Sequence, residues 1–431
     1  MSFSPSPHSL FRFTLAAVLA ILLCVGTPAV GQAYTSLYDF GLLPDGQSPS
    51  GALVVDASGN LYGTTSIGGA HGFGTVFQLA TPTTPGGPWL ESILYSFTGG
   101  ADGAKPRGLA IDKGGNLYGT TASGGATGNC VGGCGTVFKL KAPAAAGGTW
   151  DYRILHRFAG GTADGSNPIG ALVVDSRGVV YGVTRYGGAY SESETDRAGV
   201  VFRVQSRGSG FAETVLYNFG ALGDGASPLW GVMLDGLGNA YGTTGYGGTA
   251  DAGIVFKLSP QAPGEPWAET ILYSFSGQES ASSELILDKS GNLFGTKEAD
   301  GVYGGSVWRL SPPASGQTAW RYQDMFVMPG VADGAHPSGL FLDRATSTFY
   351  GTTQYSNYLS TGCGVVYQLT QPAVAGDSWT YKVLYAFTGD EDACYPRFAL
   401  TRDASGTYYG VTKNYDVDGD DFGTVFQVTP K

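Results

Sequence analysis

Histidine and positive charge are both scarce in this chain. Its 431 residues include four histidines, and 24 Lys and Arg stand against 35 Asp and Glu, which gives a formal net charge of −11 at pH 7. A metal site built from several histidines is therefore excluded. Nucleic acid is not expected as a partner, because its binding needs clustered Lys and Arg.

Long apolar segments are also nearly absent. The one such run, residues 13–25, is too short for a bilayer core of ~30 Å, so no membrane span is expected. Arg12 precedes this run and the small residues around Gly31 follow it, which is the pattern of an export signal. We expect residues 1–33 to be a signal peptide and the rest to be secreted or periplasmic, with no C-terminal anchor.

Cysteine is rare, and the four that follow the expected signal form an even set. Cys130 and Cys134 share one loop, whereas Cys363 and Cys394 are expected near the same face of one repeat. An even number of cysteines in an exported protein favours disulfides. We predict the pairs 130–134 and 363–394.

One phrase returns seven times: an aromatic residue, Gly, and Thr or Val. Its glycines are Gly63, Gly119, Gly182, Gly242, Gly295, Gly351 and Gly410. Their spacing lies between 53 residues (Gly242 to Gly295) and 63 residues (Gly119 to Gly182). A period of this size indicates one supersecondary unit copied around a ring.

Each repeat predicts four antiparallel strands. The first is an uninterrupted apolar run such as 52–55, and a Gly-Asn turn leads into the aromatic-Gly-Thr strand. A third strand follows, for example 135–138, and a fourth such as 267–275 alternates apolar and charged residues, as an outer edge strand does.

The chain begins out of phase with its repeats. Residues 34–40 form an orphan outer strand, and the last unit, 398–428, has three strands. One strand, six sets of four and three more make twenty-eight. We predict an all-β, seven-bladed β-propeller over residues 34–431, a single domain with four antiparallel strands per blade, whose ring is closed when strand 34–40 joins the last blade.

These phrases resemble the GloVer tandem repeats of exported bacterial proteins. Residues 115–121, Gly-Asn-Leu-Tyr-Gly-Thr-Thr, and residues 135–138, Gly-Thr-Val-Phe, carry the resemblance, which extends over 34–431. The resemblance implies a β-propeller of no established activity, in a group whose members often have a C-terminal sorting anchor. It implies no catalytic residue.

Residues present in every repeat are expected to hold the scaffold, since one site needs one constellation. This applies to the aspartates of the Asp-Gly-x-x-Pro turns, which are expected to cap their own turns, although a ring of carboxylates is the alternative. They are Asp45, Asp102, Asp164, Asp224 and Asp333. Function is expected where repeats differ, mostly in loops after the second and fourth strands, on what we call the upper face.

Tyrosines on the upper face form the first candidate site. Tyr186, Tyr246 and Tyr355 occupy equivalent positions in units three, four and six, with Tyr190 and Tyr358 nearby. Tyrosine rings can stack on sugar rings and bond to their hydroxyls, so these residues are the predicted glycan site. The alternative is that each ring packs on the Gly-Gly of its own loop.

An acidic loop forms the second candidate site. Its aspartates are Asp416, Asp418, Asp420 and Asp421, joined by Asp390 and Asp392 from the loop that leads into the same blade. Clustered oxygens suit calcium, which is the one cofactor hypothesised; the alternative is a solvated acidic loop.

Unit five departs most from the repeat, because Lys297 replaces Thr and Glu279, Glu298 and Asp300 gather near it. Paired carboxylates beside a lysine could carry acid–base chemistry, whereas a solvated ion pair is the alternative.

The predicted function is that of a monomeric module that binds an extracellular glycan or a protein partner without catalysis. One alternative is a carbohydrate-active hydrolase or lyase with its site at the upper channel mouth. The other is a structural repeat protein of the cell envelope.

Overall fold

The computed structural model describes most of the chain after residue 32. The described ranges are 33–125, 128–145, 147–193, 196–277, 280–298, 304–328, 330, 334–356, 362–374, 378–389, 392–413 and 422–429. They contain thirty β-strands and no helix, so they also contain no helix that could serve as a membrane span. The prediction of an all-β chain is confirmed.

The strands follow the seven repeats, here called units 1 to 7. Units 1 to 3 contain β2 (Gly46–Pro49), β3 (Val54–Val55), β4 (Leu61–Gly68), β5 (Thr75–Ala80) and β6 (Leu90–Ser96); β7 (Ala104–Ile111), β8 (Leu117–Ser123), β9 (Thr136–Lys141) and β10 (Asp151–Arg157); and β11 (Gly165–Val174), β12 (Val180–Gly187), β13 (Val200–Arg207) and β14 (Gly210–Asn218).

Units 4 to 7 contain β15 (Gly225–Leu234), β16 (Ala240–Gly247), β17 (Ile254–Ser259) and β18 (Ala268–Ser274); β19 (Ser280–Ala281), β20 (Ile286–Leu287), β21 (Leu293–Glu298), β22 (Ser306–Ser311) and β23 (Arg321–Val327); β24 (Ala335–Asp343), β25 (Thr348–Tyr355), β26 (Val365–Thr370) and β27 (Thr380–Ala386); and β28 (Thr401–Arg402), β29 (Tyr408–Val411) and β30 (Thr424–Thr429). The remaining strand is β1 (Ala33–Asp39). The count exceeds twenty-eight because the inner strand of units 1 and 5 is split in two.

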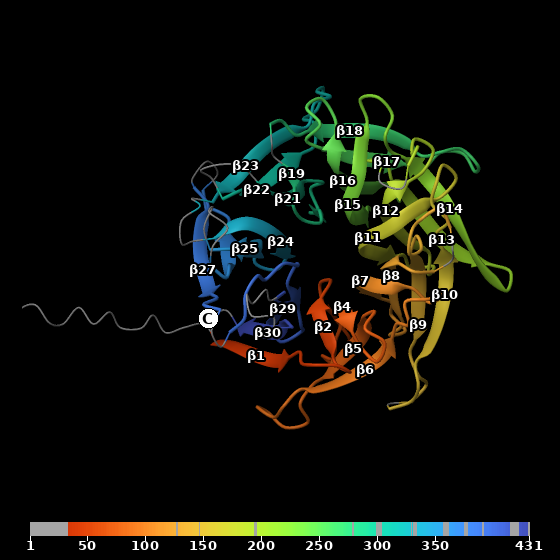
Figure 1. The fold of residues 1–431 in the computed structure, drawn as a ribbon. Helices are drawn as coiled ribbons and strands as arrows, with labels where there is room; N and C mark the ends of the chain where they lie inside the picture. Colours follow the sequence, from red (N-terminus) through yellow and green to blue (C-terminus); the bar gives the residue numbers. More distant parts are fainter. Residues whose placement is uncertain are drawn as a thin grey trace, which may run out of the picture.

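The sheets are arranged around a common centre, with the first strand of each unit inside and the fourth outside (Figure 1). Strands pair antiparallel within each unit, and units 3 and 4 are joined in one eight-stranded sheet through a single parallel contact between Ala171 of β11 and Gly231 of β15. The fold is therefore propeller-like.

The N-terminal strand pairs with the last strand of the chain. Residues Tyr34 and Asp39 of β1 lie opposite Val428 and Thr424 of β30 in an antiparallel ladder. The sheet order β1-β30-β29-β28 places the first strand outermost in unit 7. The predicted partnership of residues 34–40 with the last unit is present.

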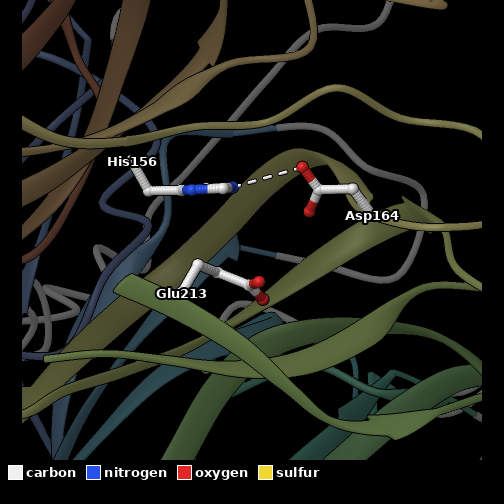
Figure 2. Close-up of side chains that lie close together, drawn as sticks. All are labelled: His156, Asp164 and Glu213. Atoms are coloured by element: carbon white, nitrogen blue, oxygen red, sulfur yellow. Dashed lines mark hydrogen bonds and ion pairs between the residues drawn. The ribbon is translucent and has the colours of Figure 1, made fainter. Parts of the chain in front are cut away.

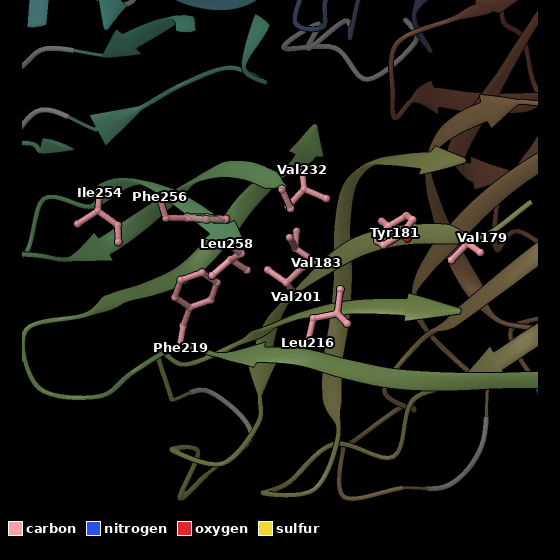
Figure 3. Packing of buried hydrophobic residues seen from close by; sticks show 11 residues of the cluster. Val179, Tyr181, Val183, Val201, Leu216, Phe219, Val232, Ile254, Phe256 and Leu258 are labelled. Carbon is pink, nitrogen blue, oxygen red and sulfur yellow. The ribbon is translucent and has the colours of Figure 1, made fainter. Parts of the chain in front are cut away.

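Apolar side chains fill the spaces between neighbouring units. One cluster joins Val183 and Val201 of unit 3 to Phe256 and Leu258 of unit 4 (Figure 3). The glycine of the repeated phrase leaves room for a large side chain of the neighbouring strand in its own unit, since a Cβ on Gly182 would lie 2.6 Å from the ring of Phe202. The repeated glycine is thus a scaffold residue.

Candidate functional site

A pocket of about 400 Å³ lies where the inner strands of several units meet. Its walls include Arg107 and Gly108 of β7, Gly170 of β11 and Trp230 of β15. A Cβ on Gly51 would lie 2.4 Å from the Cα of Gly108, so glycine is needed for the inner strands to approach this closely. The pocket is therefore a product of the central packing.

Four cationic side chains line this pocket, in a chain whose net charge is negative: Arg107, Arg185, Arg397 and Lys413. Burial, with the charges of Arg397 and Arg185, lowers the pKa of the Arg107 guanidinium. Burial and the charges of Arg397 and Arg107 lower the pKa of Lys413 in the same way. Arg107 is thus close enough to the other three cations for their charges to repel its own, and an anion would relieve that repulsion.

Two of these guanidinium groups have unused hydrogen-bonding capacity. The Nε atoms of Arg107 and Arg185 are buried and have no hydrogen-bond partner within the described part of the chain. Donors left unpaired in a buried place cost free energy, and an acceptor on a bound ligand would remove that cost.

Glu284 is the one carboxylate among the described residues that line the pocket. It lies between β19 and β20, and burial raises its pKa to about 7, although the N–H of Ala171 donates to the carboxylate. A substantial share of this side chain is therefore protonated at neutral pH, where it can donate a hydrogen bond.

An aromatic ring stands beside the cations. Trp230 lines the pocket, and its indole N–H donates to the carbonyl oxygen of Ala281 at 3.0 Å, which fixes the ring across two units. A second pocket of about 320 Å³ shares Arg185 and Leu229 with the first and is lined by Tyr246. The two pockets thus adjoin, and their shared wall is cationic.

The tyrosines predicted as a glycan site differ in their surroundings. Tyr246 lines the second pocket, and the guanidinium of Arg197 lies over its ring at 3.8 Å from the centroid. The guanidinium of Arg185 lies 5.1 Å from the ring centroid of Tyr186. Both rings are half-buried beside arginines, which sequence reasoning did not foresee.

Tyr355 and Tyr190 do not line either of these pockets. Tyr355 packs edge-on between His336 and Tyr395, with centroid distances of 5.2 and 5.4 Å. Tyr190 is 52% exposed, and Tyr358 lies outside the described residues. Tyr246 is therefore the member of the predicted set that borders a pocket.

Of the predicted calcium ligands, Asp392 alone lies in the described ranges; Asp390, Asp416, Asp418, Asp420 and Asp421 lie outside them. The Asp392 carboxylate accepts hydrogen bonds from the Tyr385 hydroxyl at 2.6 Å, the Thr388 hydroxyl at 2.8 Å and the Gly389 N–H at 2.9 Å. It caps its own turn, as the aspartates of the equivalent turns do.

In unit 5, Lys297 is buried and its Nζ lies 3.4 Å from Oδ2 of Asp324 on β23. Glu298 lies 4.0 Å from Nδ1 of His336, whereas Glu279 and Asp300 are outside the described part. Both predicted disulfides are present, joining Cys130 to Cys134 and Cys363 to Cys394.

The sequence holds a signal for the cationic pocket that was missed. Arg107 and Arg397 both follow the proline of the repeated turn, and Arg185 and Lys413 both follow the aromatic-Gly-Val-Thr phrase. Other units have Ser, Ile or Leu at the first position and Ser, Ala, Gly, Glu or Gln at the second, so cations occur there in these units alone. Departures at these inner positions, rather than in the loops, mark the pocket.

A second cluster lies at the outer rim, between units 2 and 3. His156 of β10, Asp164 of the turn before β11 and Glu213 of β14 direct their side chains toward one another (Figure 2). The Nε2 atom of His156 lies 3.2 Å from Oδ2 of Asp164, and the ligand atoms of all three lie within 4.8 Å of one another.

The same rim position is occupied differently between other units. Between units 3 and 4, the Tyr217 hydroxyl lies 3.2 Å from both Asp224 and Glu269. Between units 1 and 2, Tyr95 stacks on Tyr152 at 4.0 Å instead. In both cases the Asp of the turn, Asp224 or Asp102, lies beside side chains from two successive outer strands, although the residue types differ.

The Gloeobacter/Verrucomicrobia repeat family matches residues 27–228 and 83–308, which together are more than half of the chain. The chain belongs to this family, as its repeated phrases indicated. No curated protein sequence matches the chain.

Three solved structures of similar fold are distant from this chain in sequence. The extracellular domain of a candidate one-component system, BT4673 of B. thetaiotaomicron, matches with a TM-score of 0.53 and 12% identity over 93% of this chain and 42% of that one. A protein from Lactobacillus plantarum matches with a TM-score of 0.51 and 14% identity over 83% and 88%. A glucose dehydrogenase matches with a TM-score of 0.45 and 14% identity over 93% and 100%.

Proposed function

We propose that residues 34–431 form one seven-bladed propeller that closes into a ring. The eight-stranded sheet consists of two four-stranded units in contact at one pair of residues, Ala171 and Gly231, so it counts as two blades. The pairing of β1 with β30 supplies the fourth strand of the last blade. These pairings support the ring.

We propose that this propeller binds an acidic extracellular glycan at its centre. The observation that carries the proposal is the gathering of Arg107, Arg185, Arg397 and Lys413 around one pocket of a chain with net charge −11. Arginine forks bind carboxylate or sulfate groups with two parallel hydrogen bonds, and a cationic pocket in an acidic protein concentrates anions at one place.

The aromatic rings beside the cations favour a sugar over a small inorganic anion. Trp230 stands in the cationic pocket and Tyr246 in the adjoining one, with Arg185 between them. Aromatic faces pack against the apolar faces of sugar rings, while the arginines would hold their acidic groups. A chain of two or more sugars would span both pockets.

The small number of carboxylates in the cationic pocket favours binding over catalysis. Cleavage of a glycosidic bond needs two carboxyl groups at a defined separation. Glu284 stands without a second carboxylate among the described residues of the pocket wall. Its pKa of about 7 would suit a general acid, so an enzyme is the second candidate.

We further propose that residues 1–33 direct export and that the protein acts outside the cytoplasm. Both disulfides suit an oxidising compartment.

The test is a binding assay on purified residues 34–431 with uronate-containing, sulfated and neutral oligosaccharides, with calcium or with chelator. We expect acidic glycans to bind and the variant Arg107→Gln/Arg397→Gln to lose at least tenfold in affinity. The control is Arg153→Gln, which removes an exposed arginine paired with Asp151 on β10. Equal binding of acidic and neutral glycans, or equal affinity of both variants, would refute the proposal.

A further inference from the structure

We propose that His156, Asp164 and Glu213 form a binding site for one divalent transition-metal ion, with Zn²⁺ the best match. One imidazole nitrogen and two carboxylates are ligands that zinc accepts, and three protein ligands leave a fourth position for water. Calcium and magnesium take oxygen ligands and are poorly served by an imidazole. This site is separate from the proposed glycan pocket.

The spacing of the first two ligands suits a tetrahedral ion. Bonds of about 2.0–2.1 Å at the tetrahedral angle place neighbouring ligand atoms about 3.3 Å apart. Nε2 of His156 and Oδ2 of Asp164 are 3.2 Å apart. Glu213 lies within 4.8 Å of both, and rotation about its side-chain bonds would bring an oxygen to the same spacing.

Two of the ligands are held in place by their surroundings. The Asp164 carboxylate accepts the N–H of Ala159 at 2.8 Å and the N–H of Gly165 at 2.7 Å. The His156 ring packs edge-on against Phe158, with centroids 4.6 Å apart. Partners of this kind fix the orientation of metal ligands and raise affinity.

Glu213 provides the second observation that points to a cation. Its Oε1 is buried and has no hydrogen-bond partner in the described ranges. At equivalent junctions Oε1 of Glu91 and Oε1 of Glu269 are unpaired too, and the other oxygen of Glu269 lies 3.2 Å from the Tyr217 hydroxyl. The junction between units 2 and 3 differs in that a histidine stands beside the glutamate. The imidazole of His156 is shorter than a phenol, and it contacts Asp164 but makes no hydrogen bond to Glu213 in the described residues.

The ion would join two units of the proposed ring. His156 belongs to unit 2, whereas Asp164 opens unit 3 and Glu213 lies on its outer strand. Because the three ligands assemble only in the folded chain, metal binding would stabilise the fold.

The chain itself offers a matched variant. His156→Tyr installs the residue that stands at the equivalent junctions, at Tyr38, Tyr95, Tyr217, Tyr273 and Tyr385. The variant is therefore expected to fold, and it removes the nitrogen ligand. His336→Ala serves as the control, since it removes another histidine that faces a carboxylate, Glu298 at 4.0 Å.

The experiment is calorimetric titration of chelator-treated protein with ZnCl₂, with thermal unfolding in parallel. We expect one ion per chain, a rise of at least about 3 °C in Tm with zinc, and a loss of at least tenfold in affinity in His156→Tyr but not in His336→Ala. Glu213→Gln should weaken binding as well, which keeps the test open if His156→Tyr does not fold.

Tyr217→His should add a second ion, because it recreates the same ligand set between units 3 and 4. No zinc binding by the parent, or equal zinc binding by the parent, His156→Tyr and Glu213→Gln, would overturn the proposal.

Discussion

The ring of Tyr34 stacks on the ring of Tyr385, with centroids 4.2 Å apart and planes 7° from parallel. The Tyr34 hydroxyl also donates to the carbonyl oxygen of Asp392 at 3.0 Å. Tyr34 lies on β1 and Tyr385 on β27, so the N-terminal strand pairs with unit 7 and packs on unit 6. Residues 33–39 are therefore held to units 6 and 7 by non-covalent contacts alone in the described residues.

Loss of these contacts should destabilise the whole protein. We expect Tyr34→Ala to lower the free energy of unfolding by about 2 kcal/mol, because it removes a half-buried aromatic pair. Deletion of residues 34–40 should unfold the protein or cause it to oligomerise, since it exposes the edge of β30. Urea unfolding and gel filtration would measure both. Leu237→Ala, at a side chain that is 86% exposed, is the control. A deletion variant that melts within about a degree or two of its parent would contradict the closure model.

Stability should fall as the pH rises from about 5 to 8. Burial, followed by the charge of Asp224, raises the pKa of Glu269 to about 8, and burial with the charge of Asp45 raises the pKa of Glu91 to about 7. The folded chain thus holds protons that the unfolded chain has lost above pH 4.5, so this contribution to stability disappears as the pH passes the folded pKa values.

For each fully shielded group, the free energy of unfolding can change by at most about 1.4 kcal/mol per pH unit. We expect about half of that change here, because the side chains of Glu269 and Glu91 are partly exposed. Urea unfolding at pH 5.5, 7 and 8.5 would measure it. Glu269→Gln should flatten the slope, whereas Glu265→Gln, at an exposed side chain before β18, should leave it unchanged. A parent with no pH dependence between 5.5 and 8.5 would speak against these raised pKa values.

The strands could be predicted from the sequence because each repeat carries the local signals for its own strands and turns. Short-range rules explain these signals. Burial explains the apolar run at 52–55, turn geometry explains the Gly-Asn turns, and close packing explains the glycine at 182. The contacts between units could not be predicted. Glu213 meets His156 only because units 2 and 3 pack side by side, and no local pattern encodes that separation.

The cationic pocket was not predicted, for a related reason. The sequence prediction favoured the loops of the upper face. There, Tyr355 packs against His336 and Tyr395, and Asp392 caps its own turn. Arg107 and Arg185 come from inner strands, and their convergence depends on how the units are arranged around the centre. A charged residue at an inward-facing position of a repeat therefore indicates the central pocket more strongly than a variable loop does.

The two disulfides should differ in what they contribute. The Cys363–Cys394 bridge closes a loop of 31 residues and the Cys130–Cys134 bridge one of 4. From chain entropy we expect Cys394→Ser to cost about 3–4 kcal/mol and Cys134→Ser about 2 kcal/mol. Urea unfolding of both variants, with a count of free thiols in the denatured, unreduced parent, would test this. Four reactive thiols in the parent, or a larger loss in Cys134→Ser, would contradict it.

The close approach of the inner strands should make Gly51 intolerant of a side chain. A Cβ there would lie 2.4 Å from the Cα of Gly108, so Gly51→Ala must push units 1 and 2 apart. We expect a loss of about 1–3 kcal/mol in the free energy of unfolding and weaker binding in the pocket that both glycines line. Gly236→Ala is the matched control, because its Cβ would meet nothing within 4 Å. The control should be neutral or slightly more stable than the parent, since alanine reduces the freedom of the unfolded chain. If both variants unfold at the same urea concentration, the inner strands do not meet as described, and the central pocket loses the packing that defines it.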